Sequence, residues 1–452
     1  MTHFLMMAVL ASAALPQTTV RPAPETDLAG RIDAYIRPFA EGNNFPGVIL
    51  VARGDDIQFN KSYGMANYEL KVPNSPHTRF HIASLTKMFT AAAILLLEEE
   101  GKLDTADTVA KFLPGYPNGD KIRLEHLLVH TAGLPNVNFS EGEGRVHYTL
   151  EQLVAKFRDR PVDFEPGTRT GYSNSNYNLL ALIIEKVSGQ RYGDFIKAKI
   201  FDRLQMRNTL NDDDSSTLIE HRASGTIPDG FDGVKNAPWV DWSSKTGSGS
   251  LVSTAEDLAR FVRAEFAGTL LKPASMAKVM RRQPGFPYGW SQDELFGDKV
   301  MASGGRSPGF VTAVQYFPRD RTTIVVLSNS YSAMAQDPVV GDIAALVHDR
   351  PATSGPVAPV KPQPGQFDGV EGRYRMSSDY YAPDAILRLE VRGNYIEARW
   401  ENGEVNIIYP VGADECLDRM YWARMRFRRD SAGMVTGFSY HLVRDFTARK
   451  LD

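Results

Sequence analysis

The sequence is poor in cysteine and has no excess of charge of either sign. Cys416 is the single cysteine among 452 residues, which excludes an internal disulfide and any metal site built from several thiolates. The formal net charge of −3 arises from 51 basic and 54 acidic residues. A chain without a basic excess lacks the electrostatic footprint of a nucleic-acid-binding protein, so we expect no nucleic-acid partner.

The sequence also lacks an apolar run long enough to cross a membrane, so we expect no stable membrane span. The apolar stretch over residues 4–14 is too short for a bilayer and ends in an Ala-Ser-Ala site, after which the chain is polar and contains proline. This pattern predicts a signal peptide over residues 1–20 and a secreted or periplasmic protein, with only His3 as a source of positive charge before the apolar core. A simple apolar start of the chain is the alternative.

The order of the predicted elements indicates a large α+β domain. Strands near both ends of a helical block are typical of an antiparallel sheet flanked by helices, here with an all-helical subdomain. We expect helices over 28–40 and 84–101, a mainly helical stretch over 105–270, and strands over 48–52, 57–63, 308–317 and 322–328.

A proline-rich segment separates this domain, residues 27–350, from a second one. Residues 351–364 hold five prolines together with Ala, Ser and Gly, which is typical of an extended linker. Beyond it, short alternating strands are punctuated by turn signals such as Gly393-Asn394 and Asn402-Gly403. Residues 365–452 therefore predict a small antiparallel β-barrel domain.

The stretch Ser84-Leu85-Thr86-Lys87 opens an apolar helical run and carries the first candidate chemistry. An S-x-x-K step at a helix start sets a hydroxyl and an amine one turn apart on the same face. A serine hydroxyl needs a neighbouring base to become a nucleophile, and a desolvated lysine can be that base. The structural alternative is an ordinary helix start in which Ser84 is the N-cap.

A second candidate segment follows about ninety residues later, at Tyr172-Ser173-Asn174. Tyr172 can shuttle a proton if a nearby cationic lysine lowers its pKa from about 10. Asn174, two positions on, can point the same way and offer its amide to a substrate. A core tyrosine and a turn-forming asparagine are the alternatives.

These segments and their flanks resemble the class C β-lactamase and penicillin-binding-protein-like serine hydrolases, a family that includes D-aminopeptidase-like and esterase-like members. Five blocks occur in the order typical of that family, and they span about residues 27–346, which chance does not produce. The blocks are Ser-Leu-Thr-Lys at 84–87, Leu-Leu-Val-His-Thr-Ala-Gly-Leu-Pro at 127–135, Tyr-Ser-Asn at 172–174 with its apolar continuation, Ser-Gly-Ser-Leu-Val-Ser-Thr-Ala-Glu-Asp-Leu-Ala at 248–259, and Pro-Gly-Phe at 308–310.

The resemblance implies a β-lactamase/transpeptidase-like fold with Ser84, Lys87 and Tyr172 as catalytic residues and Asn174 at the substrate. It also implies an oxyanion hole made by the backbone N–H groups of Ser84 and, on the strand edge, Arg306. The C-terminal segment resembles more loosely the lipocalin-like domain that some members carry.

The third signature of the family departs from its usual form. Family members have Lys-Thr-Gly or His-x-Gly shortly before Pro-Gly-Phe, whereas this chain has Ser303-Gly304-Gly305-Arg306. We expect Ser303, Gly305 and Arg306 to line the substrate site, but Ser303 brings no positive charge. Either Arg306 supplies the charge that binds a substrate carboxylate, or the substrate is neutral, such as an ester. A glycine-rich strand end is the structural alternative for Ser303.

Two other motifs are better interpreted as structural. His126 and His130 stand four apart on a predicted helix, but no carboxylate pattern or third histidine supports a metal site. Residues 305–309 formally satisfy G-x-S-x-G, yet a nucleophile elbow needs a helix after the serine, and the pattern after Pro308 is that of a strand.

The sequence therefore predicts a serine hydrolase that cleaves a peptide, amide or ester bond through an acyl-enzyme on Ser84. Lys87 and Tyr172 act as general base and acid, and which of them is formally the base stays open. We expect no metal or organic cofactor and a small peptide, ester or β-lactam-like substrate. The alternative hypothesis is a non-catalytic relative that binds a peptide or cell-wall fragment. The oligomeric state is not predicted.

Overall fold

The computed structural model describes residues 27–137, 143–283, 286–332, 338–353, 357, 359–380, 382, 384–442 and 444–452. The predicted signal peptide lies outside these residues, as does part of the predicted linker. No helix in the described ranges is both long and apolar enough to span a membrane.

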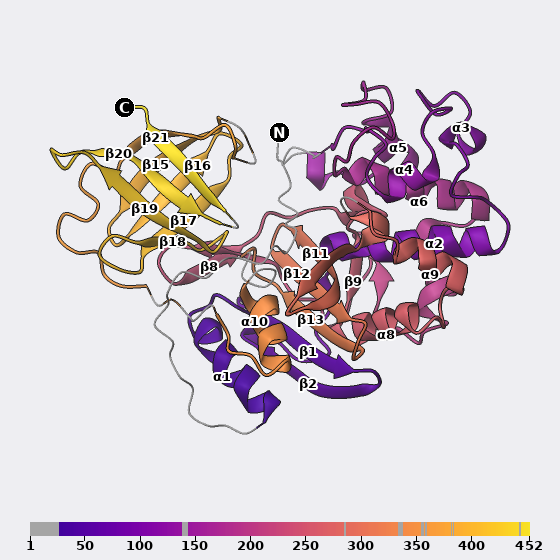
Figure 1. Cartoon of the computed structure of the whole chain (residues 1–452), viewed down its shortest axis with the longest axis horizontal. Coiled ribbons are helices and arrows are strands. Elements are labelled where there is room, and N and C mark those ends of the chain that lie inside the picture. Colours follow the sequence, from indigo (N-terminus) through magenta and orange to yellow (C-terminus); the bar gives the residue numbers. More distant parts are fainter. Residues whose placement is uncertain are drawn as a thin grey trace. The chain divides into compact units, whose positions relative to one another are not determined.

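The contacts of the chain divide it into two compact units, which we describe separately (Figure 1). The sheet unit comprises Gly47–Ser224 and Pro238–Asn329. The barrel unit comprises the described residues of Met1–Pro46, Gly225–Ala237 and Ser330–Asp452.

The sheet unit is built around a six-stranded antiparallel sheet in the order β10-β11-β12-β13-β1-β2. Every residue of β12 and β13 is buried, which explains why these strands are almost continuously apolar in sequence rather than alternating. Helix α8 packs on β13 and β1. The strands are β1 (Gly47–Arg53), β2 (Asp56–Tyr63), β10 (Ser291–Leu295), β11 (Asp298–Ser307), β12 (Phe310–Phe317) and β13 (Thr322–Ser328).

The remaining elements of the sheet unit are helices, short turns of helix and small ribbons. The helices are α2 (Thr86–Glu99), α3 (Val109–Phe112), α4 (Leu124–Leu128), α5 (Leu150–Ala155), α6 (Asn174–Ser188), α7 (Tyr192–Ile196), α8 (Ala255–Phe266) and α9 (Pro273–Val279). The short turns are η1 (Ala83–Leu85), η2 (Glu143–Arg145), η3 (Lys197–Phe201), η4 (Trp242–Lys245) and η5 (Pro287–Gly289). The ribbons are formed by β3 (Met65–Asn67) with β4 (Val72–Pro73), and by β5 (Phe80–His81), β9 (Leu251–Ser253) and β6 (Leu210–Asn211).

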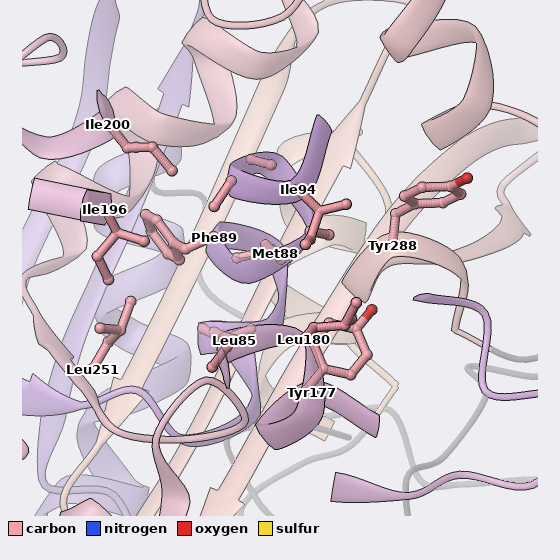
Figure 2. Packing of buried hydrophobic residues seen from close by; sticks show 14 of the residues in the cluster. Leu85, Met88, Phe89, Ile94, Tyr177, Leu180, Ile196, Ile200, Leu251 and Tyr288 are labelled. Atoms are coloured by element: carbon pink, nitrogen blue, oxygen red, sulfur yellow. The ribbon is translucent and has the colours of Figure 1, made fainter. Parts of the chain in front are cut away.

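Helix α2 is the centre of the sheet unit's core. Every residue from Thr86 to Leu97 is buried, as expected for a helix that is apolar on all sides. Side chains from α6, η3, β9 and η5 surround it, and Figure 2 labels Tyr177, Ile200, Leu251 and Tyr288 among them. The start of this helix is therefore held rigidly on several sides.

The barrel unit contains a closed eight-stranded antiparallel barrel and four further elements. Its interior is filled by a separate apolar cluster that includes Tyr374, Leu389 and Phe438. The barrel strands are β14 (Gly372–Met376), β15 (Ile386–Arg392), β16 (Tyr395–Trp400), β17 (Val405–Pro410), β18 (Cys416–Asp418), β19 (Ala423–Arg429), β20 (Val435–His441) and β21 (Asp445–Lys450). The other elements are α1 (Leu28–Glu41), α10 (Pro338–Val347) and the hairpin of β7 (Thr226–Asp229) and β8 (Gly233–Asn236).

These observations confirm the predicted α+β architecture and the C-terminal barrel. The middle of the chain is mainly helical, as expected, although β6 to β9 interrupt it with short strands. One prediction about local structure is wrong: His130 does not lie on a helix, because α4 ends at Leu128 and His130 has a left-handed φ of 59°.

A buried carboxyl group connects α8 to the segment after η5. Glu265 is 1% exposed and accepts a hydrogen bond from Trp290 Nε1 at 3.1 Å. Burial raises the pKa of Glu265 to about 8, and the Trp290 bond offsets only part of this effect. The folded protein therefore keeps a proton on Glu265 at neutral pH.

We predict that this proton makes the stability of the fold fall as pH rises. Between the ordinary glutamate pKa of 4.5 and the folded value of about 8, the unfolded chain releases the proton and the folded chain retains it. Glu265→Gln should flatten the decline and stabilise the protein at pH 8, by up to roughly 4 kcal/mol. Urea unfolding at pH 5 and pH 8 measures this, and an unchanged pH dependence in the variant would contradict it.

Candidate active site

The candidate nucleophile lies on the short turn that precedes α2. Ser84 belongs to η1, and the residue before it, Ala83, has a positive φ of 48°. A non-glycine residue in this region of backbone space is strained, and such strain persists only where the surrounding structure imposes it. Turn η1 packs on β11 and β12, so the sheet holds Ser84 in place from one side.

Lys87 reaches the Ser84 hydroxyl from the first turn of α2. Its Nζ lies 3.0 Å from Ser84 Oγ, 2.8 Å from Asn174 Oδ1 and 2.7 Å from the carbonyl oxygen of Ser248. The side chain is 1% exposed, and no described carboxylate is bonded to it. Burial, with a smaller contribution from the charge of Lys245, holds the pKa of Lys87 well below its usual 10.5. The neutral amine, which can accept a proton, is therefore favoured.

A loop between η4 and β9 supplies the carbonyl that Lys87 contacts. The four carbonyls from Lys245 to Ser248 all accept hydrogen bonds. Asn178 binds that of Thr246 at 2.7 Å, and Thr90 binds that of Gly247 at 2.7 Å. Since Thr90 belongs to α2 and Asn178 to α6, the loop is fixed to both helices.

Tyr172 also contacts the candidate nucleophile, Ser84. Its hydroxyl is 2.9 Å from Ser84 Oγ and 3.2 Å from Asn174 Oδ1. The sequence suggested that a cationic lysine would lower the pKa of Tyr172. The structure differs, because burial raises this pKa and only the hydrogen bond with Ser84 opposes it. Tyr172 is thus a neutral phenol, which can donate its own proton and accept a hydrogen bond.

Asn174 is the first residue of α6 and joins Lys87 to Tyr172 through its carbonyl oxygen. Its backbone N–H is bonded to Asn136 Oδ1 at 2.9 Å. The side-chain amide nitrogen makes no hydrogen bond to a residue that the structure describes. That donor remains available for a substrate carbonyl.

His130 contacts the segment that carries Tyr172 and Asn174 and holds it in place. Its Nδ1 accepts from the Ser173 N–H at 3.2 Å and from Asn176 at 3.1 Å, and its ring lies 4.6 Å from that of Tyr172. Burial, aided by the charge of Lys87, lowers the pKa of His130 to about 3. His130 is therefore a neutral positioning residue. Within the described ranges, no group of three or more histidines, cysteines or carboxylates is arranged to bind a metal.

The third predicted group lies on β11. Its regular pairing with β10 ends at Ala302, whereas its pairing with β12 continues to Ser307. A Cβ on Gly305 would lie 2.8 Å from Ser84 N and 2.6 Å from Thr312 Oγ1, and it would also meet the Ile82 carbonyl oxygen. This close approach requires glycine and brings the strand edge against the nucleophile's own N–H, where an oxyanion hole is expected.

Ser303 does not join the hydrogen-bond network of the nucleophile. Its hydroxyl donates to the Gly289 carbonyl oxygen at 2.8 Å. Gly289 has a φ of 87°, and a Cβ there would lie 2.7 Å from Met88 N. Ser303 therefore fixes η5 against α2. Arg306 is adjacent to Gly305 in a strand without a bulge, so its side chain starts on the opposite face of β11.

The structure thus brings Ser84, Lys87, Tyr172 and Asn174 into one network, with Gly305 beside it. Sequence reasoning missed the Ser248 carbonyl, the support by His130 and the proximity of Lys245. The block at 248–259 indicated that this region matters, but a carbonyl contact leaves no signature in side-chain chemistry. Lys245 stands out only as a lone cation among small polar residues.

Gly305→Ala tests whether the strand edge must approach Ser84 this closely. We predict that the new methyl group displaces β11 from η1, lowers kcat/KM at least tenfold and destabilises the fold by about 1–3 kcal/mol. Gly412→Ala is the matched control, because nothing lies within 4 Å of the corresponding position. Hydrolysis of a chromogenic ester and thermal unfolding measure both effects. Full activity of Gly305→Ala would contradict the assignment.

Comparison with known proteins places this geometry in a family. The sequence model described as Beta-lactamase matches residues 32–348. Penicillin-binding protein 4* of Bacillus subtilis is 32% identical over 323 residues, covering 66% of this chain and 71% of that protein. The putative penicillin-binding protein PbpX of the same organism is 31% identical over 287 residues, covering 63% and 71%.

Solved structures of similar fold include penicillin-binding protein homologues and amide hydrolases. An octameric penicillin-binding protein homologue from Pyrococcus abyssi matches with a TM-score of 0.65 and 25% identity, covering 93% of this chain and 99% of that one. A D-amino acid amidase from Ochrobactrum anthropi matches with a TM-score of 0.65 and 22% identity, covering 72% and 99%. A D-stereospecific amidohydrolase from Streptomyces matches with a TM-score of 0.58 and 26% identity, covering 67% and 94%. The chain therefore belongs to the beta-lactamase family, the β-lactamase- and penicillin-binding-protein-like serine hydrolases.

Proposed function

We propose that this protein hydrolyses a peptide, amide or ester bond through an acyl-enzyme on Ser84, with Lys87 as general base. The observation that carries the proposal is the buried amine of Lys87, 3.0 Å from Ser84 Oγ, with a pKa well below its usual value. Burial favours the neutral form of both Lys87 and Tyr172. A neutral lysine is a base and a neutral tyrosine is an acid, which supports these roles rather than the reverse.

In the first step, the Ser84 proton passes to Lys87 Nζ as Oγ forms a bond to the substrate carbonyl carbon. The negative charge that develops on the carbonyl oxygen is bound by the backbone N–H groups of Ser84 and Arg306. This role for the two N–H groups is consistent with the approach of Gly305 to Ser84 N and with the end of the β10 pairing at Ala302.

In the second step, the bond between the carbonyl carbon and the leaving nitrogen or oxygen breaks. Tyr172 donates its proton to the leaving group and recovers one from Lys87 through a water molecule, because Ser84 Oγ is now an ester oxygen without a proton. Water then attacks the acyl-enzyme by the same route and restores Ser84. Asn174 donates its free amide N–H to a carbonyl of the substrate, and Gly305 leaves room for the substrate along β11.

Amide or peptide substrates are supported by similar proteins with assigned activities. The similar solved structures include a D-amino acid amidase and a D-stereospecific amidohydrolase. We propose the same class of small amide, peptide or ester for this chain, in a secreted or periplasmic setting. A non-catalytic relative that binds such fragments is the second candidate, favoured only by Ser303 in place of the family's cation.

Covalent labelling distinguishes the two candidates. We predict that a fluorescent fluorophosphonate probe labels the wild-type protein and that Ser84→Ala abolishes the labelling, because Oγ is the nucleophile. Ser431→Ala, which removes an exposed hydroxyl from the barrel unit, is the control and should label normally. An unlabelled wild type that also hydrolyses no amide or ester would refute the enzyme and favour the binding protein.

The charge of Lys245 provides a test of the base. Because Lys245 lowers the pKa of Lys87, Lys245→Met should raise that pKa. In the variant, Lys87 is then protonated at a higher pH than in the wild type. The acid limb of kcat/KM against pH should therefore move to higher pH. Lys186→Met is the control, since Lys186 is exposed and paired with Glu151. A limb that stays in place in Lys245→Met would argue against Lys87 as the base.

A further inference from the structure

Lys245 is a cation at the edge of the active site to which the proposed mechanism assigns no proton and no bond. It is the last residue of η4, immediately before the loop whose Ser248 carbonyl binds Lys87. Its backbone carbonyl accepts from the N–H groups of Ser248 and Gly249, at 2.9 and 2.8 Å. The structural contribution of this residue to the loop is therefore made by its backbone.

The side chain of Lys245 lies beside Gly249, at a point of the loop that Ala83 also borders. A Cβ placed on Gly249 would lie 3.5 Å from Lys245 Cβ, 3.7 Å from Lys245 Cδ and 3.7 Å from the carbonyl carbon of Ala83. The aliphatic stem of Lys245 and the residue before Ser84 thus border the same point of the loop. The charge of Lys245 is also close enough to affect Lys87.

The ammonium group of Lys245 has no protein counter-ion among the described residues. The residue as a whole is partly exposed, so the described residues do not enclose it completely. Carboxylates on neighbouring elements are bonded elsewhere: Asp241 accepts from Ser243, and Asp212 lies 2.8 Å from His81. Burial lowers the pKa of Lys245 to about 8, so the side chain is still mostly protonated at neutral pH.

On the strand side of the site, Ser303 and Gly305 do not provide an equivalent charge. Ser303, at the position of the family's cation, uses its hydroxyl to bind the Gly289 carbonyl. Arg306 leaves β11 from the face opposite to Gly305. The letters Lys-Thr-Gly do occur in this chain, at 245–247, but at the end of η4 rather than on β11.

We propose that Lys245 binds a carboxylate group of the substrate, and that this protein therefore prefers anionic substrates, recognised from the loop side of the site instead of from β11. This inference rests on the proposed hydrolase function. A charge-assisted hydrogen bond to an enclosed carboxylate corresponds to roughly a 10- to 100-fold preference over a neutral analogue.

Two matched pairs of thioesters test the proposal through kcat/KM, with thiol release as the readout. The first pair is N-benzoyl-D-alanyl-thioglycolate and its thioglycolamide, which differ by a carboxylate on the leaving group. The second is the N-succinyl and N-acetyl forms of D-alanyl-thioglycolamide, which differ by a carboxylate on the acyl group. We expect the wild type to prefer the anionic member at least tenfold in one pair, Lys245→Met to lose this preference, and Lys245→Arg to retain most of it.

The ratio within a pair cancels any effect of Lys245 on Lys87, because both members use the same base. Lys186→Met, which removes an exposed charge, should keep the wild-type ratio. Equal rates within both pairs in the wild type, or a preference that survives Lys245→Met, would overturn the proposal while leaving the hydrolase function intact. A preference lost in Arg306→Ala but not in Lys245→Met would also overturn it. Failure of the hydrolase function itself is recognised separately, by absence of both turnover and labelling at Ser84.

Discussion

The site depends on keeping the Lys87 amine out of water with no carboxylate of the described residues bonded to it. Lys87 is buried among a serine hydroxyl, an asparagine oxygen and a backbone carbonyl, all of them neutral acceptors. A carboxylate partner would favour the ammonium form and leave the amine without basicity. The arrangement is costly for the fold, and the densely buried helix α2 provides the core that offsets the cost.

The elements around Lys87 hold the acceptors of its amine in place. The loop at 245–248 has every carbonyl bonded, so the Ser248 oxygen cannot move away from Lys87 without breaking contacts with α2 and α6.

On the strand side, Gly305 and Gly289 allow β11 and η5 to approach the backbone of residues 84–88. His130, itself neutral, holds the segment that carries Tyr172 and Asn174. Among the described residues, neutral acceptors thus surround the Lys87 amine, and the charge that acts on it is that of Lys245.

The sequence was sufficient to predict those parts of the site whose side chains are close together in the chain. Ser84 and Lys87 are one helical turn apart, and Tyr172 and Asn174 flank a helix start, so both pairs were predictable. The antiparallel sheet and the barrel followed from alternation and turn residues. The pKa of Tyr172 was not predictable, because burial raises it and only the hydrogen bond with Ser84 opposes this effect. The roles of Ser303, the Ser248 carbonyl and Lys245 depend on contacts between distant segments, which no local pattern records.

The protonation state of Lys87 is the central claim, and it is directly measurable. In protein labelled with ¹³C at lysine Cε, the Lys87 resonance is assigned by its loss in Lys87→Arg and followed from pH 5 to pH 11. We predict that it titrates well below 10.5, the ordinary pKa of lysine, and below the resonances of the exposed lysines. Titration of Lys87 together with the exposed lysines, near 10.5, would contradict the account.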